Sequence, residues 1–319
     1  MLTFRHSHPM NKILPALIFT LTLITAQAQQ FEKGPYTVSQ LAPGVTRIED
    51  ANSQNPSGIH IGSDGKPAGL NNCSDMYLIQ GKDKVLLIDL SNFITWDTTA
   101  ITSLRSIVSS IRGNRQLYIA VTHFHGDHTG MLPAFKNDPS VRFWIHPKEF
   151  EGRNIWPDDR LINLPENQTL DLGGGFVVES FELPGHTNHS MLYFLKGKNL
   201  VFTGDGLGSG NGVWIFSYDG FNQYRSSVDK LISYVKNPAN DVDASKLLIY
   251  PGHYWQKRDK PNLPFQYVLD MKTLIDKIKD GSAVTESVTF NQYLNTNFRY
   301  GSAVITWNKG DAERFSGLK

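Results

Sequence analysis

Cysteine is almost absent from this chain of 319 residues, which contains only Cys73. A single cysteine excludes an internal disulfide, so the fold depends on its hydrophobic core and on any metal ions that it binds. The scarcity of thiolates also argues against a closed structural zinc site. Cys73 lies in a loop-like stretch rich in Asn and Ser, and we expect it to be a small, buried or partly buried thiol and not a metal ligand.

An excess of charge of either sign is also lacking. The chain has 31 Lys and Arg residues against 30 Asp and Glu residues, a formal net charge of +1, and no long basic run. This balance excludes a nucleic-acid partner held by bulk electrostatics. With 40% hydrophobic and 19% charged residues, the composition is typical of a globular protein with a sizeable core.

The sequence has no apolar run of the roughly 20 residues that span a bilayer comfortably. The apolar segment Ile13–Ala26 is shorter, follows the basic residues Arg5 and Lys12, and ends in the small residues of Ala26-Gln27-Ala28. This pattern predicts a secretory signal peptide at residues 1–28, cleaved to give an exported, periplasmic or secreted protein with no other membrane association. An uncleaved anchor is the alternative.

Repeats and Pro/Gly/Ser linkers are missing from residues 29–319, which we therefore treat as one domain. Hairpin signals and helix-linked strands are mixed along it. The expected strands are 36–50 around a turn, 76–79, 85–88, 117–121, 141–145, 176–183, 191–195, 200–202, 247–250 and 303–307, and the expected helices are 97–112, 221–235 and 264–278. The pattern predicts an α+β fold, a four-layer αββα sandwich of two mixed β-sheets flanked by helices.

The most informative stretch is His123-Phe124-His125-Gly126-Asp127-His128, which follows an apolar strand. Side chains alternate along a strand, so His123 and His125 point the same way and can bind one ion together. Asp127 and His128 follow the turn at Gly126 and can face a second ion. Imidazole and carboxylate ligands suit zinc, iron or manganese.

Three later sites repeat the design of an apolar strand that ends in a potential ligand. The segments Leu183-Pro184-Gly185-His186, Val201-Phe202-Thr203-Gly204-Asp205 and Ile249-Tyr250-Pro251-Gly252-His253 supply His186, Asp205 and His253. Taken singly, each is more often a turn or a loop residue than a ligand. Taken together with the six-residue motif, they indicate ligands that converge on one cleft.

The ordered set His-x-His-x-Asp-His, Pro-Gly-His-Thr, Thr-Gly-Asp and Pro-Gly-His resembles the metallo-β-lactamase superfamily of metallohydrolases. It spans residues 123–253, and Leu87-Ile88-Asp89 resembles part of that family's opening hairpin. The resemblance implies two divalent metal ions, most simply zinc, with iron or manganese as alternatives. The first would be bound by His123, His125 and His186, the second by Asp127, His128 and His253, with Asp205 between them.

Two ions about 3.5 to 4 Å apart can share a hydroxide whose parent water has its pKa lowered towards about 7. That hydroxide would attack a carbonyl or phosphoryl centre, and Asp127 stands where its second oxygen could hold the hydroxide's proton, as a catalytic residue. Three other histidines, His60, His146 and His189, match no motif position, and we expect them to be structural or surface residues.

Two departures from the family bear on the substrate. The name-giving β-lactamases usually lack an Asp equivalent to Asp205, so this chain resembles the lactonase, thioesterase and phosphodiesterase branches more closely. Leu90-Ser91 stands where the family commonly has small residues, which leaves the shape of that cleft wall open.

Aromatic residues cluster near the later ligands. Those offered as substrate-binding residues are Trp214, Tyr218, Tyr254 and Trp255, with Phe216 among them, although ordinary packing would explain them equally well. The leading hypothesis is a binuclear hydrolase that opens a small carbonyl ester such as a lactone. Its partner is then a small-molecule substrate. The alternatives are a β-lactamase-like or phosphodiesterase activity, or an exported metal-binding protein without turnover.

Overall fold

The computed structural model describes residues 30–50, 74–208, 212–253 and 263–317. The predicted signal peptide, Cys73 and His60 lie outside the described residues, so their predictions stay untested. Among the residues described, no helix is both long and apolar enough to cross a membrane.

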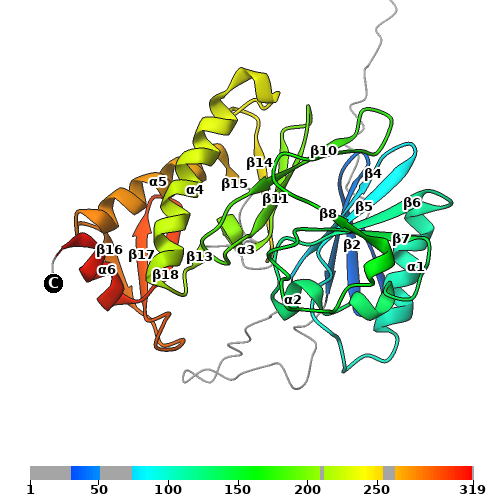
Figure 1. The fold of residues 1–319 in the computed structure, drawn as a ribbon, viewed down its shortest axis with the longest axis horizontal. Helices are drawn as coiled ribbons and strands as arrows, with labels where there is room; N and C mark the ends of the chain where they lie inside the picture. The colour runs from blue at the N-terminus through cyan, green and yellow to red at the C-terminus, as the bar shows by residue number, and fades with distance from the viewer. Residues whose placement is uncertain (1–29, 51–73, 209–211, 254–262, 318–319) are drawn as a thin grey trace, which may run out of the picture.

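The first sheet has eight strands that follow one another in chain order (Figure 1). They are β1 (Gln30–Lys33), β2 (Tyr36–Ala42), β3 (Val45–Asp50), β4 (Met76–Gln80), β5 (Lys84–Ile88), β6 (Gln116–Ala120), β7 (Val141–Ile145) and β8 (Leu161–Asn163). The strands from β1 to β5 pair antiparallel, whereas β5, β6, β7 and β8 pair parallel.

The two faces of this sheet belong to two different cores. In β5, Val85 and Leu87 pack in one buried cluster together with Leu104 of helix α1 (Ala100–Arg112), while Leu86 and Ile88 pack in the other. Successive side chains of a strand point to opposite faces, so an unbroken apolar strand such as β5 fits a sheet that is covered on both sides.

The second sheet covers the face of the first that α1 leaves free. Its strands lie in the order β15 (Leu263–Pro264), β14 (Leu248–Pro251), β12 (Leu200–Thr203), β11 (Met191–Leu195), β10 (Val177–Glu182) and β9 (Thr169–Asp171). Met191 and Tyr193 of β11 join the core shared with the first sheet, whereas Leu192 and Phe194 face the helices beyond.

Helices α4 (Tyr218–Lys236) and α5 (Phe265–Lys279) cover the outer face of the second sheet, since their buried residues share a core with Leu192 and Phe194. The order is thus α1, first sheet, second sheet, then α4 and α5, which confirms the predicted four-layer α+β sandwich (Figure 1). The remaining short helices are α2 (Gly126–Thr129), α3 (Gly204–Leu207) and α6 (Lys309–Ser316), with 3-10 turns at Leu132–Ala134, Asp158–Arg160 and Pro238–Asn240.

A third sheet, in the C-terminal part of the described chain, goes beyond the prediction of two sheets. Its strands lie in the order β13 (Val213–Trp214), β18 (Ala303–Trp307), β17 (Thr296–Tyr300) and β16 (Val284–Ser287). Sequence patterning predicted β18 but missed the other three. Figure 1 shows this sheet beside α4, α5 and α6, on the side of the molecule away from α1.

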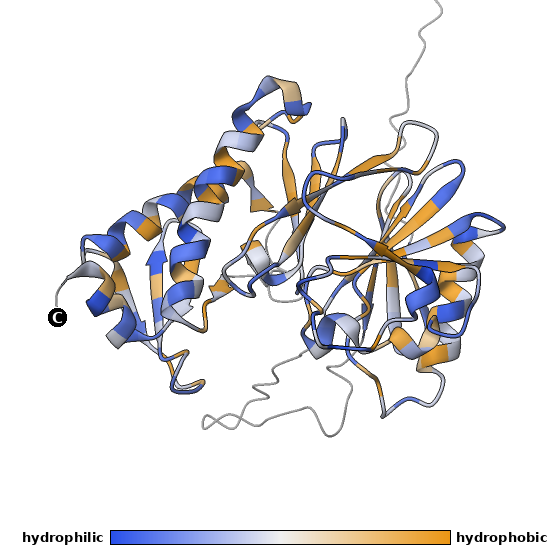
Figure 2. Ribbon diagram, viewed as in Figure 1, coloured by the Kyte–Doolittle hydropathy of each residue, from blue (hydrophilic) through white to orange (hydrophobic). Residues whose placement is uncertain are grey.

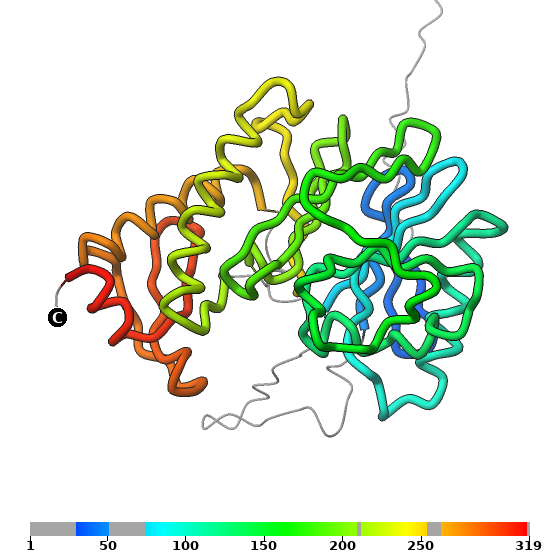
Figure 3. Tube along the Cα trace, in the orientation of Figure 1, coloured from blue at the N-terminus to red at the C-terminus, as the bar shows by residue number. Residues whose placement is uncertain are grey.

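Apolar residues concentrate along the inner strands, and the exposed helix faces are hydrophilic (Figure 2). The tube in Figure 3 shows the strands of the second sheet between the first sheet and the C-terminal elements.

Candidate metal centre

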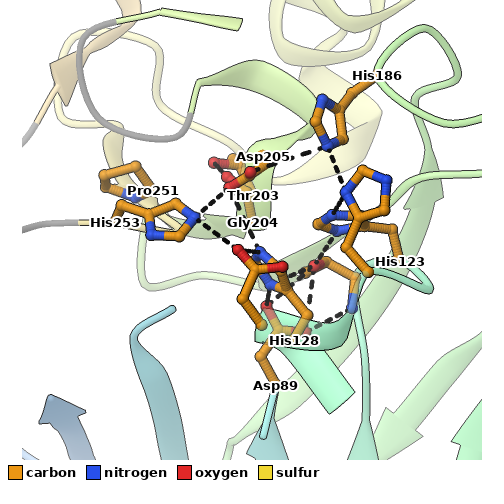
Figure 4. Close-up of polar contacts among 12 residues, drawn as sticks. Asp89, His123, His128, His186, Thr203, Gly204, Asp205, Pro251 and His253 are labelled. Atoms are coloured by element: carbon orange, nitrogen blue, oxygen red, sulfur yellow. Dashed lines mark hydrogen bonds and ion pairs between the residues drawn. The ribbon is translucent and has the colours of Figure 1, made fainter. Parts of the chain in front are cut away.

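The seven predicted ligands lie just beyond the ends of four strands: β6, β10, β12 and β14. His123 and His125 follow β6, and Asp127 and His128 belong to α2. Strands β12 and β14 are parallel neighbours, so their C-terminal ends meet at one edge, where the Gly252 N–H donates to the Gly204 carbonyl at 2.9 Å. Asp205 and His253 follow these two strand ends and face each other (Figure 4).

Three imidazoles converge in the first group, His123, His125 and His186. The Nδ1 atom of His125 lies 3.0 Å from Nε2 of His123 and 3.1 Å from Nε2 of His186. Ligands about 2.0 to 2.1 Å from one zinc ion in tetrahedral geometry are separated by about 3.3 Å. The three nitrogens therefore have nearly the mutual spacing of ligands to a single ion.

In His186 and His123, a hydrogen bond at Nδ1 determines that Nε2 is the unprotonated nitrogen. Nδ1 of His186 donates to the Trp214 carbonyl at 2.8 Å, which leaves a lone pair on Nε2. The Thr122 hydroxyl donates to Asp89 at 2.9 Å, so it accepts from Nδ1 of His123 at 3.1 Å, and Nε2 of His123 is also left with a lone pair. Both rings thus present an unprotonated nitrogen to the centre, as metal binding requires.

The second group contains Asp127, His128, Asp205 and His253. The Oδ1 atom of Asp205 lies 3.2 Å from Nε2 of His253 and 3.5 Å from Nε2 of His128. Its Oδ2 atom lies 3.8 Å from Nε2 of His186, so the carboxylate stands between the two groups (Figure 4). Asp127 completes the set with Oδ2 at 3.5 Å from Nε2 of His253.

The polar atoms at this centre fit a cation. Nε2 of His128 and Oδ1 of Asp205 are buried and have no hydrogen-bond partner among the described residues. Such orphaned atoms are costly in a folded protein unless an ion or water satisfies them. Nδ1 of His128 meets Oδ2 of Asp89 at 2.8 Å, the carboxylate–histidine pairing that orients a ligand towards a metal.

The two groups differ in charge. Burial, together with neighbouring histidines, lowers the pKa of His125 to about 3 and holds the pKa values of His123 and His186 below the ordinary value for histidine. These rings are neutral at physiological pH. They can therefore bind an ion without first losing a proton.

Carboxylates dominate the other group. Burial alone would lower the pKa of His128, but the charges of Asp89, Asp127 and Asp205 raise it above the ordinary value. Asp205 likewise outweighs the effect of burial on the pKa of His253 and raises it. The carboxylates around both rings thus strongly favour positive charge. A divalent cation could supply this charge in place of the protons.

A third cluster contains two histidines that we expected to be structural or surface residues. Nδ1 of His189 lies 2.5 Å from Oε1 of Glu182, and Nε2 of His146 lies 3.9 Å from the same oxygen. The two rings stack with centroids 4.9 Å apart. His146 and His189 therefore take part in one polar network, which no sequence motif predicted.

The predicted substrate-binding aromatics do not share one location. The Trp214 carbonyl binds His186, and the Trp214 ring packs 5.2 Å from that of Phe290. The Tyr218 ring lies 6.3 and 6.0 Å from the rings of Trp307 and Phe315 and 4.5 Å from the guanidinium of Arg314, so its observed contacts are with the C-terminal elements. Tyr254 and Trp255 lie outside the described residues.

Phe216 is an aromatic residue that lies against two of the candidate ligands. Its ring centroid lies 5.4 Å from His186 and 6.0 Å from His125. Sequence reasoning named Phe216 only as a neighbour of Trp214, and assigned no role to Asp89 or Glu149. The end of an apolar strand marked Asp89, whereas no sequence signal marked Glu149.

Comparisons with known proteins agree with this geometry. A family model described as the metallo-beta-lactamase superfamily matches residues 74–253, more than half of the chain. An atrochrysone carboxyl ACP thioesterase of Aspergillus aculeatus is 24% identical over 195 residues, 61% of this chain and 54% of that protein. A beta-lactamase-like protein 2 homolog of Caenorhabditis elegans is 25% identical over 223 residues, 68% of this chain and 63% of that protein. The chain thus spans less than two thirds of the length of these relatives.

Solved structures show the same fold at low sequence identity. A metallo-beta-lactamase from Pontibacter korlensis superposes with a TM-score of 0.52 at 14% identity, covering 76% of this chain and 99% of that one. A metallo-beta-lactamase of Pseudomonas aeruginosa in its mono-zinc form gives a TM-score of 0.51 at 14% identity, covering 77% and 96%. With the family model matched across the segment that carries all seven candidate ligands, the chain belongs to the metallo-beta-lactamase superfamily.

Proposed function

We propose that this protein is a two-ion hydrolase that opens a small carbonyl ester, with a lactone as the first candidate substrate. The observation that carries the proposal is the place of Asp205. Its Oδ1 atom faces His128 and His253, and its Oδ2 atom faces His186, so one carboxylate stands between the two ligand groups. A single ion bound by the three histidines would leave the second group without a cation.

Ions held there would act as Lewis acids on the carbonyl oxygen and lower the pKa of an attacking water, and zinc suits the donor set. Asp127 is the proposed proton acceptor. Its side chain is 24% exposed, whereas those of His128, Asp205 and His253 are 0%, 9% and 5% exposed. Water therefore reaches the Asp127 carboxylate more readily than the other members of its group.

Apolar surface beside the three histidines favours a substrate with an acyl or ring portion. The Phe216 ring lies against His186 and His125, and the Phe124 ring lies 4.8 Å from His125. Two residues before Phe216, Trp214 packs on Phe290, which is 45% exposed. Such aromatic surface binds acyl chains and rings by removing apolar area from water.

Thioester hydrolysis is the second candidate. Several relatives are named atrochrysone carboxyl ACP thioesterases, and hydrolysis of a thioester uses the same attack on a carbonyl carbon. A β-lactamase-like or phosphodiesterase activity would use the same ions on an amide or a phosphoryl group. The non-catalytic alternative is a protein that binds metal without turnover.

A substrate panel separates these candidates. The zinc-loaded protein is assayed with lactones, acyl thioesters, nitrocefin and bis-nitrophenyl phosphate, next to the Asp205→Ala and His128→Ala variants. We expect the fastest turnover with a lactone, and a loss of about 100-fold or more in both variants because each removes a group that holds charge at the reacting centre.

Metal content measured in the same samples decides the remaining alternatives. Two bound ions with no hydrolysis of any panel member would contradict the proposed function and favour the metal-binding protein. Faster turnover of a thioester, nitrocefin or the phosphodiester would replace the lactone with that substrate class.

A further inference from the structure

Glu149 is a buried carboxylate that lies between the two loops carrying the three-histidine group. Its residue is only 6% exposed, and it follows β7 in a turn that contains none of the predicted ligands. Buried carboxylates are rare because their charge must be compensated by hydrogen bonds or by a partner. The contacts of Glu149 therefore show what it does.

One carboxylate oxygen holds the first ligand loop. Oε1 of Glu149 accepts the backbone N–H of Phe124 at 3.0 Å. Phe124 stands between the ligands His123 and His125. The hydrogen bond thus fixes the backbone between the two histidines.

The other oxygen holds the second ligand loop. Oε2 of Glu149 accepts the backbone N–H of His189 at 3.0 Å, and the Thr187 hydroxyl also bonds to this carboxylate. Thr187 directly follows the ligand His186. One rigid carboxyl group therefore sets the separation between the loop of His123 and His125 and the loop of His186.

The nearby His146, Glu182 and His189 brace this arrangement. The Glu149 N–H donates to Nδ1 of His146 at 3.3 Å, so the proton of the neutral His146 ring is on Nε2, which faces Glu182. Glu182 in turn accepts from Nδ1 of His189. With its Nε2 protonated, His146 has no lone pair for a metal, and the trio is a hydrogen-bonded support for the loop that Glu149 holds.

We propose that Glu149 is a positioning residue for the three-histidine metal site. It acts through the backbone of the two loops and touches neither ion nor substrate. Without its carboxylate, two partly buried N–H groups lose their acceptor, and the Met191 N–H bond to the Thr122 carbonyl, at 2.8 Å, remains to hold the bases of the two ligand loops together. The three nitrogens would then lose their common geometry, while the group around Asp205 would keep its own. This inference rests on the two-ion assignment of the proposed function.

The test measures metal affinity without any substrate. Zinc is competed from the full-length protein with a chromophoric chelator, and His186→Ala and His253→Ala identify which binding step belongs to which group. We expect Glu149→Ala to weaken the three-histidine step by about 10- to 100-fold, the range typical of changes to groups that orient metal ligands. The step that depends on His253 should stay within about twofold of wild type.

Two further variants make the result decisive. Glu149→Gln keeps the side-chain volume and one acceptor oxygen but places an NH2 group against one loop. We therefore expect an intermediate loss of zinc affinity at the three-histidine step. If Glu149→Ala does not fold, Glu149→Gln provides the test. Glu179→Gln is the matched control, because Glu179 is a half-buried carboxylate that also accepts hydrogen bonds, from Tyr234 at 2.8 Å and Lys196 at 2.9 Å. It should lower thermal stability and leave both metal steps unchanged.

Unchanged metal affinity in both Glu149 variants, or an equal loss at the two steps, would overturn the proposal. The outcome is distinguishable from failure of the proposed function. A protein that binds two ions and hydrolyses nothing would refute the hydrolase proposal and still show whether Glu149 acts selectively on the three-histidine step.

Discussion

At Gly252 the backbone lies close to two of the candidate metal ligands. A Cβ atom at this position would lie 2.5 Å from Oδ1 of Asp205, 2.9 Å from the carbonyl carbon of Gly204 and 3.0 Å from Cε1 of His128. Real Cβ contacts are longer than this, so a side chain at 252 must displace a ligand or the backbone beside it. The Gly in Pro-Gly-His is therefore part of the construction of the metal centre.

We predict that Gly252→Ala weakens the ion held by the Asp205 group by more than about 10-fold, because the methyl group pushes Asp205 away from His128. Equilibrium chelator competition measures this. Gly126→Ala is the control, since a Cβ there would meet no atom within 4 Å. Retention of both ions in Gly252→Ala at wild-type affinity would show that the loop accommodates the methyl group.

The clustering of the candidate ligands could be predicted because their segments follow apolar strands, and parallel strand ends meet at one edge. Glu149 could not, since it binds the amides of Phe124 and His189, and nothing in the sequence pairs a side chain with a distant backbone N–H. Asp89 could be predicted only in part. Its position after β5 was visible, but its contact with His128 depends on how the chain folds between them.

At the scale of elements, Asp270 joins α5 to the hairpin of β17 and β18. Its Oδ2 atom accepts the Ser302 N–H and the Ser302 hydroxyl, each at 2.8 Å. Partial burial pulls the pKa of Asp270 upward, but the bonds from Ser302 and Gln266 outweigh it and hold the pKa below its usual value. The charged form is thus favoured in the folded protein.

We predict that Asp270→Asn lowers the free energy of unfolding by about 1 kcal/mol at neutral pH, since bonds to a charged acceptor are the stronger ones and solvent weakens them here. The folded pKa lies below the unfolded value of about 3.9, so this stabilisation is complete above about pH 5 and is lost as the pH falls through the folded pKa. In denaturant titrations between pH 3 and 7, the difference in unfolding free energy between variant and wild type should therefore narrow towards the acid end.

Glu32→Gln serves as the control for Asp270→Asn, because it removes one negative charge from the fully exposed strand β1. Its unfolding free energy should stay within about 0.5 kcal/mol of wild type, as is usual for surface substitutions. A difference between Asp270→Asn and wild type that stays constant down to pH 3 would refute the role of the Asp270 charge.

Two of the strands that patterning missed in the third sheet are short or exposed. All four residues of β16 are exposed, with Val284 at 69%, so the strand carries no hydrophobic alternation to detect. β13 has two residues and exists only through its pairing with β18. β18 and α5 had a clear period and were predicted to within one residue of their observed bounds, whereas the predicted starts of α1 and α4 were three residues off.

At the scale of the whole molecule, the third sheet is connected to the metal centre. Trp214 in β13 pairs with Thr306 of β18, and the Trp214 carbonyl accepts the Nδ1 proton of His186. Next to Thr306, Trp307 stacks on Phe221 of α4 with centroids 4.1 Å apart and 5° between the planes. The C-terminal core thus holds the strand that orients one of the three histidines.

This connection predicts that a cavity in the C-terminal core lowers metal affinity at the three-histidine site. Trp307→Ala should cost about 3 to 5 kcal/mol of stability by removing a fully buried side chain, and should also weaken the ion bound through His186 because β13 loses its support. Leu104→Ala in α1 is the matched control. It opens a cavity in the core on the opposite side of the sandwich, should cost about 2 to 5 kcal/mol and should leave metal affinity unchanged. Equal metal affinities in the two variants under conditions where both are folded would mean that the third sheet stabilises the chain without orienting His186.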